Sequence, residues 1–101
     1  MSGVDVGHVD EIPVGEGRTF AVGGEQIAVF RLRDGSVHAV NAVCPHKGGP
    51  LADGLADDRV VVCPLHSHTF DICTGTEVSG GRLAVRSYPV EVVDGTIRIT
   101  A

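Results

Sequence analysis

Tryptophan is absent from this chain of 101 residues, and the other aromatic side chains are limited to three phenylalanines and one tyrosine. The interior must therefore be filled mainly by valine, isoleucine, leucine and alanine. Lysine occurs once, and the formal net charge of −5 argues against nucleic-acid binding, which requires a basic surface. An acidic chain is instead compatible with docking on a positively charged partner protein.

Signals for export and for membrane insertion are also missing. The N-terminus has neither the basic nor the apolar segment of a signal peptide, and no hydrophobic run approaches the length of a membrane span. We therefore expect a cytoplasmic protein with no membrane partner, folded as a single domain over residues 1–101. Three cysteines, an odd number in a reducing compartment, indicate metal binding or catalysis sooner than a disulfide framework.

Turn-forming residues are abundant and predict an all-β fold. Fourteen glycines and five prolines favour short strands over long helices, and no segment shows sustained helical periodicity. The segment "DRVVVC", which begins at Asp58, reads as a strand, and residues 4–9 and 18–22 are weaker strand candidates.

Two hairpins are predicted by Asp-Gly pairs between apolar runs. The first, "QIAVFRLRDGSVHAVNAV", turns at Asp34-Gly35, and the second, "YPVEVVDGTIRIT", turns at Asp94-Gly95. Strand alternation places Ala28, Phe30 and Leu32 on one face of the first hairpin and Arg31 and Arg33 on the other. In the second hairpin the expected apolar face consists of Val90, Val92, Ile97 and Ile99.

Two loops each carry one cysteine and one histidine close together. "CPHKGGPL" gives Cys44-x-His46, and after sixteen intervening residues "CPLHSHTF" gives Cys63-x-x-His66. Four such ligands on loops 44–50 and 63–69 suit zinc or an iron–sulfur cluster. One thiolate and one imidazole per loop favours two metal atoms side by side, with both sulfurs on one and both nitrogens on the other. A zinc-braced β module without redox activity is the alternative.

This pattern resembles the Rieske family, and "GGPLADG", "FDICTG" and the closing "YPVEVVDGTIRI" extend the resemblance from about residue 26 to about residue 100. The resemblance implies an antiparallel β-sandwich with a small cluster-binding subdomain made of two loops. It also implies a Rieske-type [2Fe-2S] cluster held by Cys44, His46, Cys63 and His66.

The same resemblance allows an expectation about the reduction potential. Two imidazoles in place of two thiolates raise it from about −400 mV in plant-type ferredoxins to between about −150 and +300 mV. High-potential respiratory members carry a disulfide at the positions of Gly49 and Leu65, and hydroxyl residues at those of His68 and Phe70. This chain has no cysteine at Gly49 or Leu65 to form that disulfide, and His68 and Phe70 replace the hydroxyl residues. We therefore expect a reduction potential near the low end of the range, around −150 mV.

A family member of this size carries single electrons and catalyses nothing alone. "CPHKGGPLADG" is particularly similar to the small subunit of assimilatory NAD(P)H nitrite reductase, whose large subunit holds flavin and siroheme, and this is the favoured system. "CPLHSHTFDICTGTEV" and the short length fit, as well or better, a soluble ferredoxin that passes electrons from a flavin reductase to an aromatic-ring hydroxylating dioxygenase.

Five further residues near this pattern have less specific interpretations. Cys73 matches no ligand position and is expected to be a small, partly buried side chain, with a reactive thiol as the alternative. Asp71 is expected to fix a turn by local hydrogen bonds. Lys47 either faces solvent or helps a partner to dock, His68 either lines the cluster loop or faces solvent, and His38 is expected to be an ordinary strand histidine.

Overall fold

The computed structural model describes residues 3–43, 51, 55–57, 59–63, 69–78, 80 and 84–100, with the backbone alone at 55–57. Within these residues the chain forms short strands and one 3-10 turn, η1 (Val9–Glu11), so the predicted all-β class is confirmed. The strands are β1 (Val4–His8), β2 (Gly17–Val22), β3 (Glu25–Arg31), β4 (Val37–Asn41), β5 (Leu55–Asp57), β6 (Val60–Val62), β7 (Thr69–Asp71), β8 (Ser87–Tyr88), β9 (Val90–Val93) and β10 (Thr96–Ile99).

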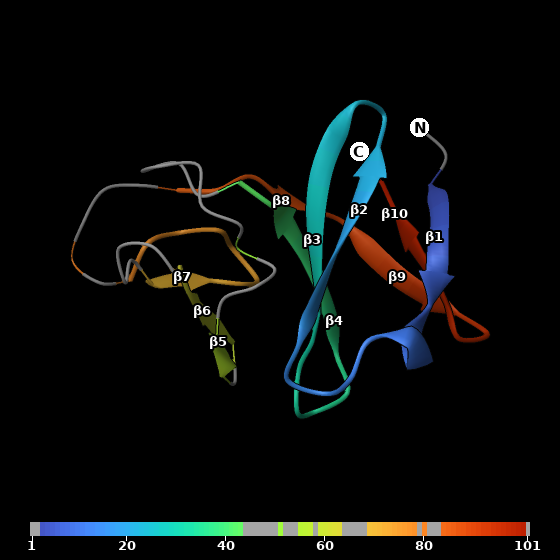
Figure 1. Cartoon of the computed structure of the whole chain (residues 1–101), viewed down its shortest axis with the longest axis horizontal. Helices are drawn as coiled ribbons and strands as arrows, with labels where there is room; N and C mark the ends of the chain where they lie inside the picture. The colour runs from blue at the N-terminus through green and yellow to red at the C-terminus, as the bar shows by residue number, and fades with distance from the viewer. Residues whose placement is uncertain are drawn as a thin grey trace.

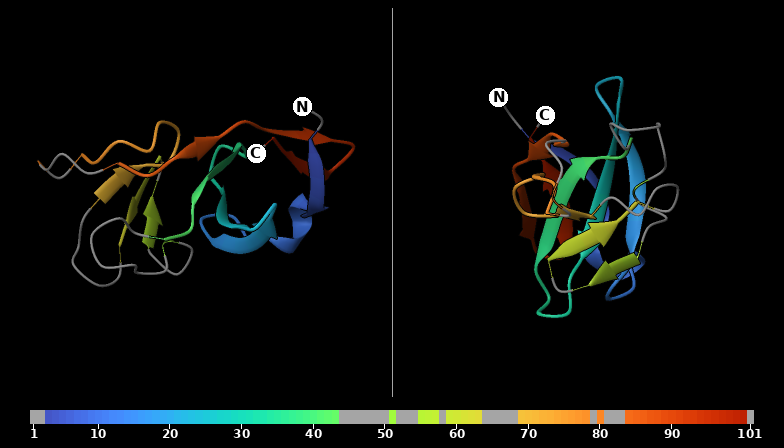
Figure 2. Two further views of the ribbon diagram at one scale, coloured as in Figure 1. Left: turned by 90° about the horizontal axis from the view of Figure 1, so that it is seen from above. Right: turned by 90° about the vertical axis from the view of Figure 1, so that its left-hand side faces the viewer.

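Three antiparallel sheets follow one another across the molecule (Figure 1). The middle sheet has the strand order β2-β3-β4-β8. On one side of it lies the sheet β1-β10-β9, and on the other lies the small sheet β5-β6-β7, as the view from above also shows (Figure 2). In the sequence, the predicted ligand loops follow β4 and β6, so that the second one connects two strands of the small sheet.

A first core, which we call the sandwich core, joins the middle sheet to β1-β10-β9. Its fully or almost fully buried members are apolar apart from one tyrosine hydroxyl: Ile12, Val22, Ile27, Val29, Ala39, Tyr88, Ile97 and Ile99. A second core, the subdomain core, joins the middle sheet to β5-β6-β7. It consists of Ala28, Phe30, Leu32, Val40, Ala42, Leu51, Val61, Cys63, Phe70, Ile72 and Val85.

Strand β3 supplies both cores because successive side chains of a strand point to opposite faces. Ile27 and Val29 enter the sandwich core, whereas Ala28 and Phe30 enter the subdomain core, and all four are fully buried. The predicted shared face of Ala28, Phe30 and Leu32 is confirmed, and the face opposite to it, which the sequence analysis described only by its arginines, is buried as well.

Arg31 lies on that opposite face without being freely solvated. Its Nη1 donates to the carbonyl oxygens of Val9 at 3.3 Å and Ile12 at 3.2 Å, and its side chain is 25% exposed. The guanidinium thus satisfies backbone acceptors at the border of the sandwich core, where a free charge would be costly to bury. An arginine in an apolar strand need not mark a solvent-exposed face.

Both predicted hairpins are confirmed as β3–β4 and β9–β10. In the second, Val93 pairs with Thr96, and the intervening Asp94 and Gly95 have φ of 52° and 82°, as a two-residue hairpin turn requires. One detail differs from the prediction: Ile97 is fully buried, but its partner Val92 is 42% exposed. Among the described residues, no helix is long and apolar enough to cross a membrane.

Candidate metal centre

The two predicted ligand loops begin at strand ends that one core holds together. Loop 44–50 starts two residues after Ala42, and the second loop starts at Cys63, immediately after β6. Both Ala42 and Cys63 belong to the subdomain core. The N–H of Leu51 donates to the carbonyl oxygen of Ala42 at 2.8 Å, which ties the far end of the first loop to its beginning. The fold therefore fixes both loops at their bases.

Cys63 is the predicted ligand that falls within the described residues. It is 1% exposed and forms no disulfide, so its sulfur is free to bind a metal. Cys44, His46 and His66 lie outside the described residues, as do Lys47 and His68. Among the side chains that the structure describes, no group of three or more His, Cys, Asp or Glu is placed to hold a metal ion. The described thiol thus fits a ligand role, and the other three ligands remain predictions.

Asp71 closes the turn that follows the second loop. Its Oδ1 accepts the backbone N–H of Cys73 at 2.8 Å and of Thr74 at 3.0 Å, while its Oδ2 accepts from Arg59 Nε at 3.1 Å. Burial, the largest single influence, raises the pKa of Asp71, but these three donors together hold it below its usual value. The predicted role of Asp71 in fixing the turn is confirmed.

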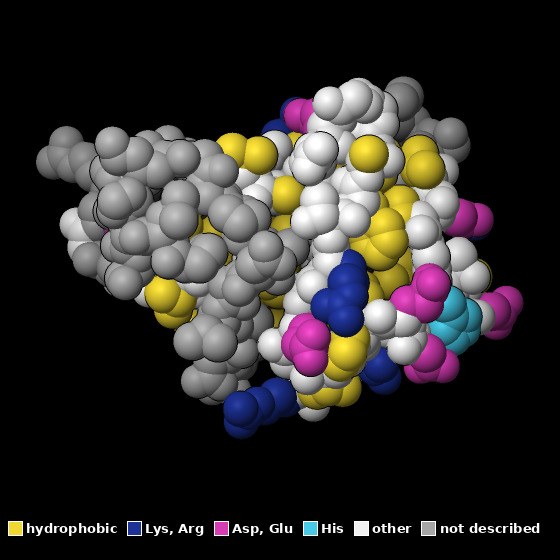
Figure 3. All heavy atoms as spheres, in the orientation of Figure 1, with side chains coloured by type: hydrophobic (Ala, Val, Ile, Leu, Met, Phe, Trp, Pro, Cys, Tyr) yellow, Lys and Arg dark blue, Asp and Glu magenta, His cyan; other side chains and the backbone are white. Residues whose placement is uncertain are grey.

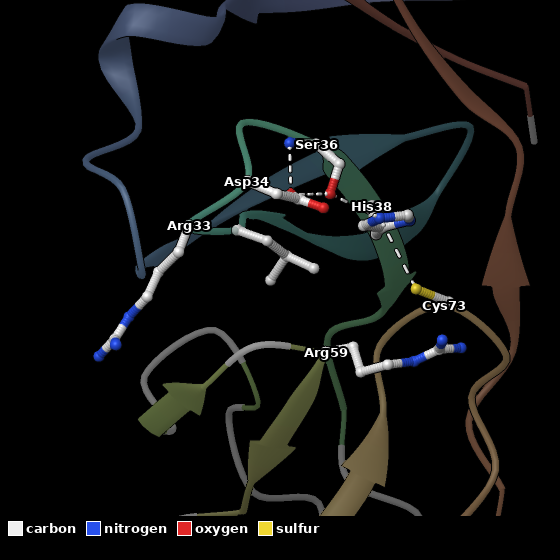
Figure 4. A pocket seen from close by; sticks show the side chains of 7 residues that line it. Arg33, Asp34, Ser36, His38, Arg59 and Cys73 are labelled. Carbon is white, nitrogen blue, oxygen red and sulfur yellow. Dashed lines mark hydrogen bonds between the residues drawn. The ribbon is translucent and has the colours of Figure 1, made fainter.

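Cys73 is partly buried, as the sequence predicted, and it has a neighbour that the sequence did not indicate. Its Sγ lies 3.6 Å from Nε2 of His38, a residue of β4 far away in the chain. The two side chains line a pocket of about 220 Å³ together with Arg33, Asp34, Ser36 and Arg59 (Figure 4). Spacing along the chain could not reveal this pair, because 35 residues and a change of sheet separate the two positions.

Two exposed apolar side chains flank the ligand loops. Val43 directly precedes Cys44 and is 48% exposed. Val78 is 53% exposed, and its N–H donates at 2.8 Å to the carbonyl oxygen of Thr69, at the end of the second loop. On the face shown in Figure 3, acidic side chains of the described residues gather instead at the end formed by β1 and η1. The border of the loops is therefore apolar at both of these positions.

Comparisons with known proteins agree with this arrangement. A family model described as the Rieske [2Fe-2S] domain matches residues 2–89. The chain is 31% identical over 90 residues to the ferredoxin component of the naphthalene 1,2-dioxygenase/salicylate 5-hydroxylase systems of a Ralstonia species, covering 88% of this chain and 86% of that protein.

Two solved structures are similar over almost the whole chain. The ferredoxin of carbazole 1,9a-dioxygenase from Nocardioides aromaticivorans IC177 superposes with a TM-score of 0.90 at 31% identity, covering 98% of this chain and 97% of that one. A candidate NADH-dependent nitrite reductase small subunit from Mycobacterium tuberculosis gives a TM-score of 0.90 at 32% identity, with coverages of 96% and 92%.

The chain therefore belongs to the Rieske [2Fe-2S] domain family, and the predicted sandwich with a small cluster-binding subdomain is confirmed. Membership implies a Rieske-type [2Fe-2S] cluster, a group for which the free and buried Cys63 is a suitable ligand. The protein is accordingly a Rieske-type electron carrier, and its ferredoxin relatives belong to oxygenase systems.

Proposed function

We propose that Cys44, His46, Cys63 and His66 hold the cluster. Their spacing on two loops supports this assignment, and so does the position of Cys63 at the end of β6 in the subdomain core. When bound, such a cluster accepts and releases one electron. The chain's own contribution is to fix the bases of the loops through Ala42, Leu51 and Cys63, and to exclude water from the Cys63 sulfur by burial.

Two cysteine substitutions test the ligand assignment. Cys63→Ser should lose the red-brown colour together with the iron and acid-labile sulfide, because the thiolate is removed at a fixed position. Cys73→Ser is the matched control and should keep all three, since Cys73 contacts His38 and occupies no predicted ligand position. Full iron and sulfide in purified Cys63→Ser would refute the assignment. Stoichiometric zinc in a colourless wild-type protein would instead favour the zinc-braced module.

We further propose that the protein is the ferredoxin of a multicomponent oxygenase system, which carries electrons from a flavin reductase to the terminal oxygenase. The observation that carries this proposal is the match to the Ralstonia ferredoxin component, over 88% of this chain and 86% of that protein. The carbazole dioxygenase ferredoxin supports it with an almost end-to-end match in both directions. This order of preference reverses the one that the first ligand loop suggested.

The apolar border of the loops is where we expect these partners to dock. An electron must leave from the cluster end, and Val43 and Val78 offer exposed apolar surface directly beside the two loops. Fully burying a valine-sized side chain contributes about 1.5–3 kcal/mol, so burying the exposed half of Val43 or Val78 against a partner would contribute about 1 kcal/mol. Partner recognition would then depend on these valines together with the loop residues.

A second candidate function is that of the small subunit of an assimilatory NAD(P)H nitrite reductase. The M. tuberculosis structure supports it at a similar identity and at the same TM-score as the dioxygenase ferredoxin. The "CPHKGGPLADG" segment supports it as well. The fold of the carrier is common to both systems, so the partner proteins must distinguish them.

Reconstitution distinguishes the two functions. The holoprotein should restore NADH-dependent substrate hydroxylation when it is mixed with the flavin reductase and terminal oxygenase of a multicomponent oxygenase system. Nitrite-dependent NADH oxidation with a siroheme-containing large subunit would establish the second candidate and overturn the first. Val43→Asp and Val78→Asp should each raise the KM for the partner about fivefold, which corresponds to the loss of about 1 kcal/mol of apolar burial. Val92→Asp, on the exposed side of β9 in the sheet that packs on the other core, is the control and should leave it unchanged.

A further inference from the structure

One carboxylate lies inside the molecule, where an apolar side chain would be expected. Among the residues that the structure describes, Glu77 is the only one with a charged side chain that is buried, and it is 7% exposed. Glutamate is almost never buried to this extent unless another group compensates its charge, because desolvation of a carboxylate is costly. The position of Glu77 therefore has to be explained by its surroundings.

Glu77 lies beside the strand that follows the second ligand loop. It forms an antiparallel bridge with Phe70 of β7, on the side of β7 away from β6. A backbone hydrogen bond of 2.8 Å flanks the bridge on each side, and one of them joins the Val78 N–H to the carbonyl oxygen of Thr69. Bonds at these flanking positions make the bridge a non-hydrogen-bonded pair, in which the two side chains come closest together.

The side chain of Glu77 lies on the same face of the small sheet as a predicted ligand. Paired residues point to one face, so Glu77 shares its face with Phe70 and, across β7, with Val61. Both of these side chains are fully buried in the subdomain core, which also contains Cys63. Strand spacing and rise place the α carbons of Glu77 and Cys63 on the order of 12 Å apart.

A charge in such surroundings acts over a longer range than a charge at the surface. Buried apolar side chains have a low dielectric response, and salt screens a buried charge much less than an exposed one. Net charge is one of the factors that set the reduction potential of an iron–sulfur cluster, and a nearby negative charge makes electron uptake less favourable. This direction holds whichever group pairs with Glu77, because loss of the carboxylate charge makes the site more positive by one unit.

We propose that Glu77 is a determinant of the reduction potential of this carrier, and that its buried carboxylate lowers the potential of the cluster. The proposal rests on the ligand assignment above, since it requires the cluster to be bound at Cys63. The charge acts in the same direction as the absence of a hydroxyl group at Phe70, its partner in the bridge. The two paired residues therefore both favour a low potential.

Two substitutions separate charge from shape in redox titrations of the holoprotein. Glu77→Gln removes the charge at almost unchanged volume and should raise the midpoint potential. Glu77→Asp keeps the charge and should stay closer to the wild type. Glu91→Gln is the matched control: its carboxylate is 63% exposed on β9, in the sheet that packs on the other core, and the potential should not change. The shift in Glu77→Gln should persist as salt is raised, as expected for a buried charge.

The outcomes distinguish this proposal from the ligand assignment. An unchanged or lowered potential in Glu77→Gln, with iron, sulfide and visible spectrum retained, would overturn the role of Glu77 and leave the ligands as assigned. Equal shifts in Glu77→Gln and Glu77→Asp would also overturn it, because they would show a structural effect. Partial loss of the cluster in a variant does not obscure the result, since a redox titration reports only on molecules that contain a cluster. Glu77→Met is a second uncharged variant with the same expected shift.

Discussion

Replacing Phe70 by alanine should release the cluster before it unfolds the sandwich. Phe70 lies in β7, directly after the second ligand loop, and is fully buried in the subdomain core. A buried phenylalanine removes about 150–250 Å² from water, which corresponds to about 4–6 kcal/mol as an upper bound. Phenylalanine-to-alanine changes in protein cores cost about 3–5 kcal/mol. This loss is a large part of the total stability of a domain, about 5–15 kcal/mol.

The location of the loss makes the prediction specific. The strands of the small sheet have three residues each, so the subdomain core supplies most of what attaches that sheet to the rest of the fold. In Phe70→Ala the visible absorption of the cluster should therefore disappear at a lower denaturant concentration than the far-ultraviolet signal of the strands.

The matched control is Ile97→Ala, a fully buried change in the sandwich core. It should cost about 2–5 kcal/mol, and the two signals should fall together because the whole sandwich is weakened. Denaturant titrations of both holoproteins, followed by visible absorption and circular dichroism, make the comparison. Coincident transitions in Phe70→Ala, or a loss below about 1 kcal/mol, would refute the reasoning that the subdomain core holds the cluster sheet in place.

The remaining predictions concern the potential, a turn and a carboxylate. A redox titration should place the midpoint near −150 mV, and a value above about +100 mV would contradict the expectation drawn from Phe70 and the missing disulfide. Gly75→Ala should lower the free energy of unfolding by more than about 1 kcal/mol, because φ is +80° and an added Cβ would collide with the Val85 carbonyl oxygen. Gly35→Ala is the control: its φ is +88°, but open space surrounds it, so the loss measured by thermal or chemical unfolding should be smaller. Because its pKa is lowered on folding, ionised Asp71 contributes stability that is lost as the pH falls from about 4 through its folded-state pKa, and Asp71→Asn should flatten that part of the pH–stability profile.

The hairpins were predictable because their signals are local. The Asp94-Gly95 pair needs positive φ at both residues, and the structure has 52° and 82°; the first hairpin turns through a longer loop, closed by the Leu32 N–H to the Ser36 carbonyl oxygen, in which Gly35 takes the positive φ of 88°. The double burial of β3 was not predictable from the same residues. Alternation identifies two faces, but a face with valine, isoleucine and a flanking arginine reads as half-exposed until a second sheet is known to cover it.

In the candidate site, too, the residues related by local spacing were predicted, and the contact between distant segments was not. Cys63 was identified from its spacing to His66, since metal ligands that share a loop must be close in sequence. The contact between His38 and Cys73 was missed because it joins β4 to the turn after β7, and only the packing of the small sheet on the middle sheet brings the two together. Asp71 lies between these cases: its bonds to the N–H groups of Cys73 and Thr74 are local and were expected, whereas its ion pair with Arg59 spans 12 residues.

The two cores also explain how so small a chain can combine a stable scaffold with a site built on loops. The sandwich core is formed by strands of four to seven residues together with β8 and η1, and its formation does not depend on the ligand loops. The subdomain core packs on the opposite face of β3 and β4, so that Ala42 and Cys63, at the bases of the two loops, rest on strands that the sandwich core also holds. Because Ala42 and Cys63 rest in one packed core, the positions from which the two predicted ligand loops start are fixed relative to each other by the fold.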